Sequence, residues 1–251
     1  MISKGQIKFV YSFGKKKTRD EHQLFLAEGV KILRDILPYF EAEYVCATEE
    51  AYDEIKSLTK SHVEMATHAE IEKMTQLQSP PKALALLKMP QRKLDFTSIS
   101  KSLVLALDGV QDPGNVGTIL RIADWFGINT VLCSQQTADV YNPKTIQATM
   151  GAIARVSVSY VDLPSTLQTL KDQYKMPIYG TFLDGKNMYE TELTSNGVIV
   201  MGNEVNGVTS EIDKMSDHRL YIPNYPVGVP TSESLNVSVA TAIVCAEFRR
   251  R

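Results

Sequence analysis

The sequence predicts an α/β protein in two parts, a small mixed unit over residues 1–95 and a mostly parallel sheet over residues 96–251. Three observations support this prediction. Compact apolar runs alternate with helical patterns in the second part, which favours a parallel sheet. The first part contains only short apolar runs. Between them, residues 89–99 are polar and without periodicity, as is typical of a linker.

In the first part, the run from Leu24 to Gly29 predicts a short strand. The apolar spacing from Val30 to Leu37 then predicts an amphipathic helix. Residues 44–47 and 83–87 are two further strand candidates, and a polar helical stretch between them includes residues 70–74.

The second part begins with a buried type of strand at residues 103–107, followed by a helix that contains Ile119 and Phe126. A second strand and helix follow at residues 130–133 and 144–154. The later strand candidates lie at residues 156–158, 178–182, 198–201 and 220–222, and a final helix begins near Ser234. Ligands of such sheets bind at the carboxyl ends of strands, and the unusual residues of this chain fall there.

Composition narrows the class of protein. The 251 residues are 43% hydrophobic and 22% charged, as expected of a globular protein with a sizeable core. No apolar run reaches the length of a membrane helix, and the N-terminus lacks the apolar region of a signal peptide, so we expect a cytoplasmic protein. The 3 cysteines and 4 histidines show no metal-ligand spacing, so no metal site is predicted.

The net charge of −2 does not favour nucleic-acid binding as a bulk property. Basic residues nevertheless gather at both ends of the chain. They are Lys4, Lys8, Lys15, Lys16, Lys17 and Arg19 at one end, and Arg249, Arg250 and Arg251 at the other. Such clusters are compatible with a solvated face or with contacts to RNA phosphates.

The first candidate site loop runs from Asp112 to Arg121, directly after a strand. Asp-Pro-Gly predicts a turn, Asn115 a helix cap, and Gly117 a close approach of backbone. Arg121 follows in the helix, and a guanidinium near helix N-terminal amides suits a phosphate. The alternative is an ordinary capped helix with a surface arginine.

The second loop follows the strand at residues 198–201, and in it Gly202 and Gly207 flank the carboxylate of Glu204. Two glycines suggest a ligand that passes close to the backbone, while a plain turn is the alternative. The loop matches neither the phosphate-binding nor the dinucleotide-binding motif.

The third loop starts at Ile222-Pro223 and leads through a Pro- and Gly-rich stretch to the last helix. Ser232 or Ser234 is suited to cap that helix. Capping does not explain why Ser234, Asn236 and Ser238 alternate with apolar residues at an end that looks buried. Buried polar groups usually need partners, and a ligand is one possible partner.

Taken together, the three loops resemble the three motifs of the SpoU (TrmH) family of RNA ribose 2′-O-methyltransferases, of the SPOUT superfamily. The matching residues are Asn115-x-Gly117-x-x-x-Arg121, Gly202-Asn203-Glu204-x-x-Gly207, and Ile222-Pro223 with Ser234-Leu235-Asn236-Val237-Ser238-Val239-Ala240. This resemblance covers roughly residues 100–251. The first ninety residues resemble the L30e-like substrate-binding domain of family members that act on ribosomal RNA, on the basis of Phe25–Gly29.

The resemblance implies a C-terminal deep trefoil knot, although chains as a rule do not knot. It also implies that S-adenosylmethionine sits bent in the knot. Gly202, Ile222 and Leu235 would line its pocket, with Thr181, Leu183 and Asn203 beside them. It further implies a homodimer, with the last helix and the first-motif helix near the interface.

For the reaction, the resemblance makes Arg121 the residue that activates a ribose 2′-hydroxyl. Arginine stays protonated, so we expect Arg121 to clamp a phosphate. The proton acceptor is left open, and a neighbouring RNA phosphate is one candidate. Asn115 would orient Arg121 or the ribose, and Glu204, Ser234 and Asn236 would shape the site and hold Arg121. The run at residues 224–233 is longer than is usual in the family, which leaves open how RNA enters.

Ribosomal RNA is the predicted substrate, with transfer RNA as the alternative. The sequence is compatible with two other functions. One is a non-enzymatic RNA-binding or assembly protein on the same fold, against which the complete polar set speaks. The other is an α/β enzyme that uses a different nucleotide, against which the missing phosphate and dinucleotide motifs speak.

Overall fold

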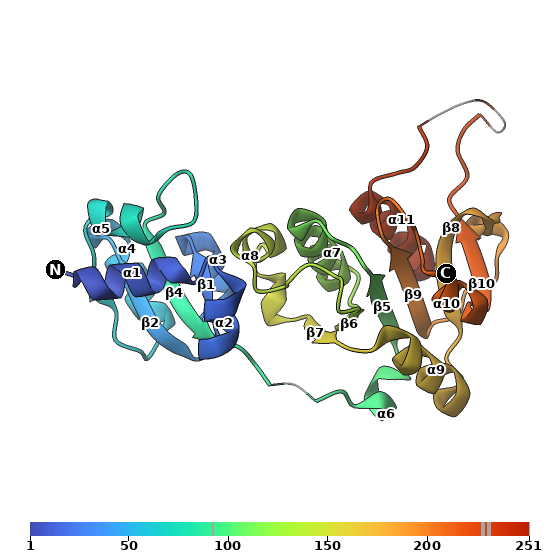
Figure 1. Ribbon diagram of the computed structural model, residues 1–251, viewed down its shortest axis with the longest axis horizontal. Coiled ribbons are helices and arrows are strands. Elements are labelled where there is room, and N and C mark those ends of the chain that lie inside the picture. The colour runs from blue at the N-terminus through green and yellow to red at the C-terminus, as the bar shows by residue number, and fades with distance from the viewer. Residues whose placement is uncertain (92, 227–228, 230–231, 251) are drawn as a thin grey trace. The chain divides into compact units, whose positions relative to one another are not determined.

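The computed structural model describes residues 1–91, 93–226, 229 and 232–250 (Figure 1). Four residues of the long 224–233 run, at positions 227, 228, 230 and 231, lie outside the described residues, as does Arg251. The chain forms two compact units. Met1–Gln91 and Asp139–Ala154 make the first, and Arg92–Ala138 and Arg155–Arg251 make the second.

The first unit is a sheet of 4 strands in the order β1-β4-β2-β3, with helices packed on it. Its elements before the linker are α1 (Lys4–Ser12), α2 (Lys16–His22), β1 (Leu24–Glu28), α3 (Val30–Ile36), β2 (Ala42–Ala47), α4 (Glu49–Leu58), β3 (Glu64–Met65), α5 (His68–Met74) and β4 (Ala83–Lys88). The three predicted strands and the helix after residue 30 are found. The helices α2 and α4 are rich in charge and carry few apolar residues, so the apolar pattern did not reveal them, and α1 was missed as well.

Residues 139–154 return from the second half of the sequence to the first unit. They form α8 (Pro143–Thr149), which packs against β1, and the short 3-10 helix η1 (Ala152–Ala154). Gln147 donates its side-chain amide to the carbonyl of Glu28 at 2.8 Å. The sequence predicted a single boundary between residues 95 and 96, and so it did not predict that residues 139–154 belong to the first unit.

A buried ion pair anchors the returning segment. Arg19 is almost fully buried, and its Nη2 lies 2.6 Å from Oδ2 of Asp139. The same guanidinium donates to the carbonyls of Phe13 and Gly14 at 2.8 and 3.0 Å. Arg19 is therefore a structural residue and does not belong to the solvated basic face expected at the N-terminus.

The second unit is a sheet of 6 strands in the order β10-β8-β9-β5-β6-β7. Every neighbouring pair is parallel, as predicted. Its elements are α6 (Phe96–Ile99), β5 (Leu103–Asp108), α7 (Pro113–Trp125), β6 (Thr130–Cys133), β7 (Ser157–Tyr160), α9 (Leu163–Tyr174), β8 (Ile178–Asn187), the 3-10 helix η2 (Met188–Glu190), β9 (Gly197–Gly202), α10 (Ser210–Met215), β10 (His218–Tyr221) and α11 (Val237–Arg250).

The central strands β5 and β9 are buried along their whole length, and α9 packs its apolar residues on the same core. The last helix, α11, packs against α7 and β9. Arg249 donates to the carbonyls of Phe126 and Gly127 at 2.7 and 3.1 Å, and Arg250 pairs with Glu247 at 2.8 Å. These two arginines hold helix ends, so the RNA contacts considered for them find no support here.

None of the helices in the described ranges is long and apolar enough to cross a membrane.

Candidate active site

The predicted site loops lie together at the carboxyl edge of the parallel sheet. Asp108, the last residue of β5, is in register with Gly202, the last residue of β9. One strand further on, Gly180 of β8 is in register with Val200. The first two loops therefore leave neighbouring strands, and the third leaves β10, which pairs with β8 in the same parallel sheet.

A chain of side-chain hydrogen bonds connects the three loops. Nδ2 of Asn236 donates to Oδ1 of Asn115 at 3.0 Å. Nδ2 of Asn115 then donates to Oε1 of Glu204 at 3.0 Å. Each loop thus contributes one polar residue, and Asn115 stands in the middle with both ends of its amide engaged. We call Asn236, Asn115 and Glu204 the relay.

Glu204 also holds the backbone of the first loop. Its carboxylate accepts from the amides of Gln111 and Asp112 at 3.3 and 3.5 Å, although the side chain is exposed. With the side-chain amide of Asn115, three donors of the first loop bind this carboxylate. Glu204 therefore links the loop after β9 to the start of α7.

Asn115 is not the helix cap that the sequence suggested. Asp112 caps α7, with its Oδ1 accepting from the amide of Asn115 at 2.8 Å. Pro113 takes the first helical position, where its missing N–H is no loss. Asn115 is the third residue of α7, which leaves its side chain available for the relay.

The last helix begins later than predicted, at Val237. Oδ1 of Asn236 accepts from the amides of Ser238 and Val239 at 2.9 and 3.4 Å, and from Oγ of Ser238 at 2.6 Å. Asn236 is therefore the cap, because these are the amides that a helix leaves free at its start. Ser234 is exposed outside the helix, so the expectation of a buried polar end at Ser234 is wrong.

The backbone of the second loop requires both of its glycines. A Cβ on Gly202 would overlap the backbone of Gly207 and Val208, so only glycine fits there. Gly207 has a φ of +69°, a conformation that favours glycine. Asn203 braces the turn by donating to the carbonyl of Gly109 at 2.7 Å and accepting from the amide of Val205 at 2.9 Å. The plain-turn alternative therefore explains both glycines.

Thr181 and Leu183 follow the point where β8 stops pairing with β9. Oγ1 of Thr181 donates to the carbonyl of Val200 at 2.9 Å. Leu183 is 67% exposed, Leu235 is 47% exposed and Ile222 is half-buried. Leu183 in β8, with Ile222 and Leu235 in the third loop, thus leaves apolar surface open to a ligand.

Arg121 is exposed on α7, and it forms no hydrogen bond or ion pair with the residues that the structure describes. It lies eight residues after Pro113, so a rise of about 1.5 Å per residue puts it roughly 12 Å along the axis from the helix start. The Cα of Arg121 therefore lies about two turns from the start of α7. Its charge is available to a partner outside the chain.

Sequence reasoning missed several residues that hold the site. Oδ2 of the buried Asp108 accepts from the amide of Thr209 at 2.7 Å, and Oγ of Ser134 accepts from the amide of Gly109 at 3.0 Å. The Arg219 guanidinium lies 3.8 Å from the centre of the Phe182 ring. A charged residue that ends an apolar strand was the signal for Asp108, whereas no sequence signal paired Phe182 with Arg219.

Comparison with known proteins finds relatives along nearly the whole chain. The 23S rRNA (guanosine(2553)-2′-O)-methyltransferase RlmP of Bacillus subtilis is 32% identical over 239 residues, which cover 93% of this chain and 92% of RlmP. The 23S rRNA (guanosine-2′-O-)-methyltransferase RlmB of Neisseria meningitidis is 34% identical over 151 residues, or 59% of this chain and 58% of RlmB.

Solved structures are similar along the chain from end to end. A protein assigned to the TrmH family of RNA methyltransferases from Porphyromonas gingivalis has a TM-score of 0.88 at 36% identity, covering 100% of this chain and 99% of its own. The SpoU methyltransferase AviRb of Streptomyces viridochromogenes, solved with AdoMet, has a TM-score of 0.85 at 20% identity and covers 99% of this chain and 98% of its own. The second likeness shows the fold alone.

The parallel sheet with its three strand-end loops, preceded by a separate small unit, defines an RNA methyltransferase with a substrate-binding domain. The model of the SpoU rRNA Methylase family matches residues 102–246, and that of the MRM3-like substrate binding domain matches residues 4–85. The chain belongs to the SpoU rRNA methylase family. The predicted family, enzyme class and α/β fold are thereby confirmed.

Proposed function

We propose that the chain transfers the methyl group of S-adenosylmethionine to a ribose 2′-hydroxyl of ribosomal RNA. The observation that carries this proposal is the relay of Asn236, Asn115 and Glu204, which joins the three family loops at the carboxyl edge of the sheet. RlmP, which is similar over 93% of the chain, is named for this reaction on 23S rRNA.

The residues at the strand ends fit the proposed cofactor. Leu183, Ile222 and Leu235 offer apolar surface that is partly open to solvent, as an adenosine ring requires. Thr181, Gly202 and Asn203 bring backbone groups to the same edge. When bound, S-adenosylmethionine would supply an activated methyl group together with its own leaving group.

Arg121 is proposed to bind an RNA phosphate next to the target ribose. Its guanidinium is protonated at ordinary pH and has five N–H donors, so it holds an anion well but does not take a proton. We assign the 2′-hydroxyl proton to a phosphate oxygen of the RNA. Asn115 orients the ribose, while Glu204, Ser234 and Asn236 keep the three loops in the geometry that alignment of the reacting groups demands.

A homodimer and a trefoil knot belong to the same proposal. Trp125 on α7 is 85% exposed, and Val239 on α11 is exposed as well. Because α7 and α11 pack together, these apolar groups would meet a second copy at one face. The return of the chain from the edge strand β10 to α11, which packs on β9, supports a knotted path.

Two measurements test the proposed function. Calorimetry with S-adenosylmethionine, NAD and ATP should show binding of the first alone, and binding of NAD or ATP instead would contradict it. Mapping of 2′-O-methyl groups in total RNA from cells with and without the gene should show one ribosomal position lost. Loss from transfer RNA alone would overturn ribosomal RNA as the substrate. Action on ribosomal RNA would place the chain with assembling ribosomes, and we propose the cytoplasm.

A further inference from the structure

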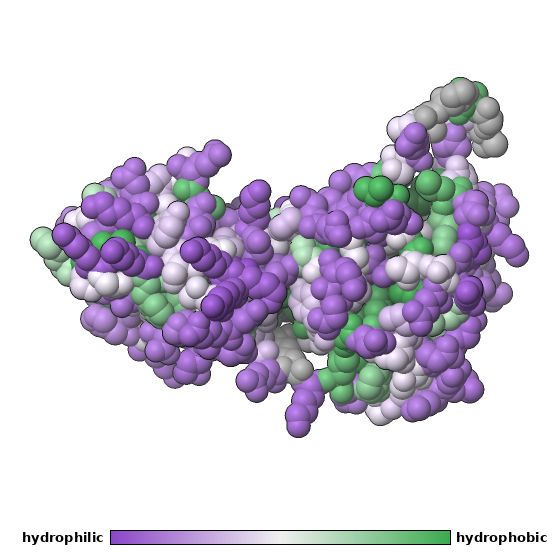
Figure 2. Space-filling model, viewed as in Figure 1, coloured by the Kyte–Doolittle hydropathy of each residue, from purple (hydrophilic) through white to green (hydrophobic). Residues whose placement is uncertain are grey.

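The first helix of the chain presents a basic face with an aromatic ring in it. Lys4, Lys8 and Tyr11 are spaced four and three residues apart on α1, so their side chains lie along one face, and all three are exposed. Lys15, Lys16 and Lys17 follow, and the sequence has no acidic residue before Asp20. Figure 2 shows a mainly hydrophilic surface over α1 and α2.

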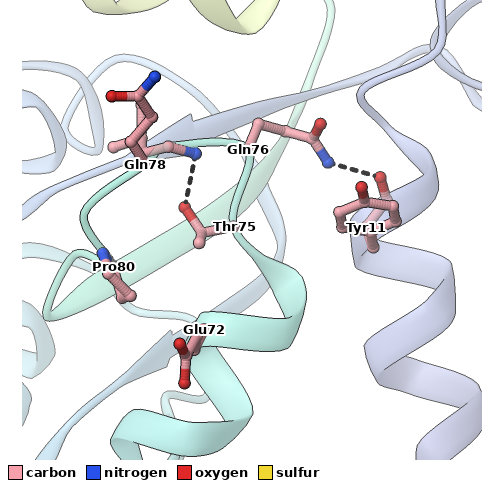
Figure 3. Close-up of a pocket in the computed structure, with 7 residues that line it drawn as sticks. Tyr11, Glu72, Thr75, Gln76, Gln78 and Pro80 are labelled. Carbon is pink, nitrogen blue, oxygen red and sulfur yellow. Dashed lines mark hydrogen bonds between the residues drawn. The ribbon is translucent and has the colours of Figure 1, made fainter.

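Tyr11 forms one wall of a surface pocket of about 380 Å³. The rest of the pocket comes from α5 and the loop between α5 and β4, and it includes Glu72, Gln76, Gln78 and Pro80 (Figure 3). The ring of Tyr11 is well placed to take a planar ligand, because the side chain is 55% exposed. All of these residues belong to the first unit.

The pocket loop is held in place by a buried carboxylate beneath it. Oε1 of Glu28 accepts from Oγ1 of Thr75 at 2.5 Å and from the amide of Gln76 at 3.0 Å. Nε2 of Gln76 in turn donates to the carbonyl of Tyr11 at 2.7 Å, which ties the loop to α1. The walls are therefore set before any ligand arrives, which lowers the entropic cost of binding.

We propose that this pocket binds one unpaired nucleotide of the substrate RNA, with its base against Tyr11 and the adjoining phosphates along Lys4, Lys8 and Lys15. Proteins bind single strands by combining base stacking on aromatic rings with a cationic track for the backbone. The structure supplies both elements at one place. This inference rests on the proposed function, since it takes RNA to be the substrate.

The polar groups of the pocket select among bases. The carboxylate of Glu72 only accepts hydrogen bonds, so it favours a base that carries an exocyclic amino group. Adenine, cytosine and guanine have such a group, whereas uracil offers two carbonyl oxygens and a single ring N–H. The amide of Gln78 both donates and accepts, so it does not reverse this preference.

Fluorescence anisotropy with the full chain tests the pocket, using labelled oligoadenylate and oligouridylate of twelve nucleotides. Tyr11→Ala should weaken oligoadenylate binding about tenfold, as expected for loss of one stacked base. Tyr11→Phe should bind as the unaltered chain does, since the ring is retained. Tyr39→Ala is the matched control, because Tyr39 is a 64% exposed tyrosine of the same unit outside the pocket. Equal effects of Tyr11→Ala and Tyr39→Ala would overturn the proposal.

Two further variants test the recognition chemistry. Glu72→Gln should reduce the preference for oligoadenylate over oligouridylate, and an unchanged preference would refute the role of Glu72. Lys8→Ala should lower the slope of log K against log salt by about one, as loss of one phosphate contact does. An unchanged slope would remove Lys8 from the phosphate track.

Methyl transfer to unmodified ribosomal RNA separates this proposal from the proposed function. If the unaltered chain methylates that RNA and Tyr11→Ala does so with the same KM, the pocket proposal fails and the function stands. If oligonucleotide binding depends on Tyr11 but no RNA is methylated, the function fails and the pocket stands. Agreement of both requires a raised KM for RNA with an unchanged Kd for S-adenosylmethionine.

Discussion

Asn236 donates its side-chain amide to Asn115 over 3.0 Å, and this bond joins residues that are 121 positions apart in the chain. The oxygen of the same Asn236 side chain caps α11. One residue therefore starts the last helix and fixes the first-motif helix at the site.

Variants of Asn236 separate these two roles. Asn236→Ala should lose both, with a stability cost of about 1 kcal/mol for the missing cap and a fall in methyl transfer. Asn236→Asp keeps an oxygen for the helix amides but cannot donate to Asn115. It should retain the melting temperature and still lose activity, on the order of a hundredfold if the loop shifts by 1 Å. Full activity of Asn236→Asp would show that the bond to Asn115 is dispensable.

Arg121→Ala should abolish methyl transfer to ribosomal RNA while calorimetry shows unchanged binding of S-adenosylmethionine. The side chain is exposed and makes no ion pair with any residue in the described ranges, so the fold should be unaffected. Arg121→Lys keeps the charge without the planar fork and should retain partial activity. Arg34→Ala, on an exposed arginine of the first unit, is the control. Activity of Arg121→Ala equal to the control would remove Arg121 from the site.

Because Glu28 is buried, we expect it to make the stability of the first unit depend on pH. Desolvation raises the pKa of this carboxyl, and hydrogen bonds from Thr75 and Gln76 only partly oppose it. A raised pKa means that the contribution of Glu28 to stability is complete at low pH and is lost as pH rises through the folded-state pKa. Glu28→Gln should therefore raise the melting temperature more at pH 8 than at pH 5.

Glu70 provides the opposite case in the same unit. Hydrogen bonds, chiefly from the backbone of Thr67, lower the pKa of Glu70. Its stabilising contribution is present near neutral pH and is lost as pH falls through that lowered pKa. Glu70→Gln should lower the melting temperature at pH 7 by an amount that shrinks in acid. The same pH trend for both variants would contradict the assigned causes.

The ion pair between Arg19 and Asp139 should be important for stability because it is buried. Arg19→Met leaves the mostly buried carboxylate of Asp139 without its charged partner and should cost about 3 kcal/mol in the free energy of unfolding. Adding Asp139→Asn should restore part of that loss. Lys16→Met breaks the exposed pair with Asp20 and should cost less than 1 kcal/mol. Urea denaturation measures all three, and equal costs for Arg19→Met and Lys16→Met would be inconsistent with the buried pair.

Trp125→Lys should convert the proposed dimer into a monomer. Light scattering after size exclusion should give twice the 28.0 kDa mass of one chain for the unaltered protein. Tyr39→Lys, at an exposed tyrosine of the first unit, should leave that mass unchanged. A monomeric unaltered protein, or a Trp125→Lys protein that is still dimeric, would contradict the interface.

Sequence patterns predicted the strands best and the contacts least. Buried strands such as β5 and β9 are runs of apolar residues, and these stand out without a structure. The position of Asn115 shows the limit. Its sequence neighbours made it a plausible cap, but Asp112 took that role, and the partners of Asn115 come from Glu204 and Asn236 far along the chain.

The sequence by itself determined the family, the parallel sheet and the set of loops that form the site, because strand and loop types depend on local residue pattern. Only the tertiary structure decided which residues meet. Residues 139–154 joined the first unit, Arg19 became a buried partner of Asp139, and the relay connected three loops. These are contacts between distant segments, and they are set by the packing of the whole chain, which no local pattern encodes.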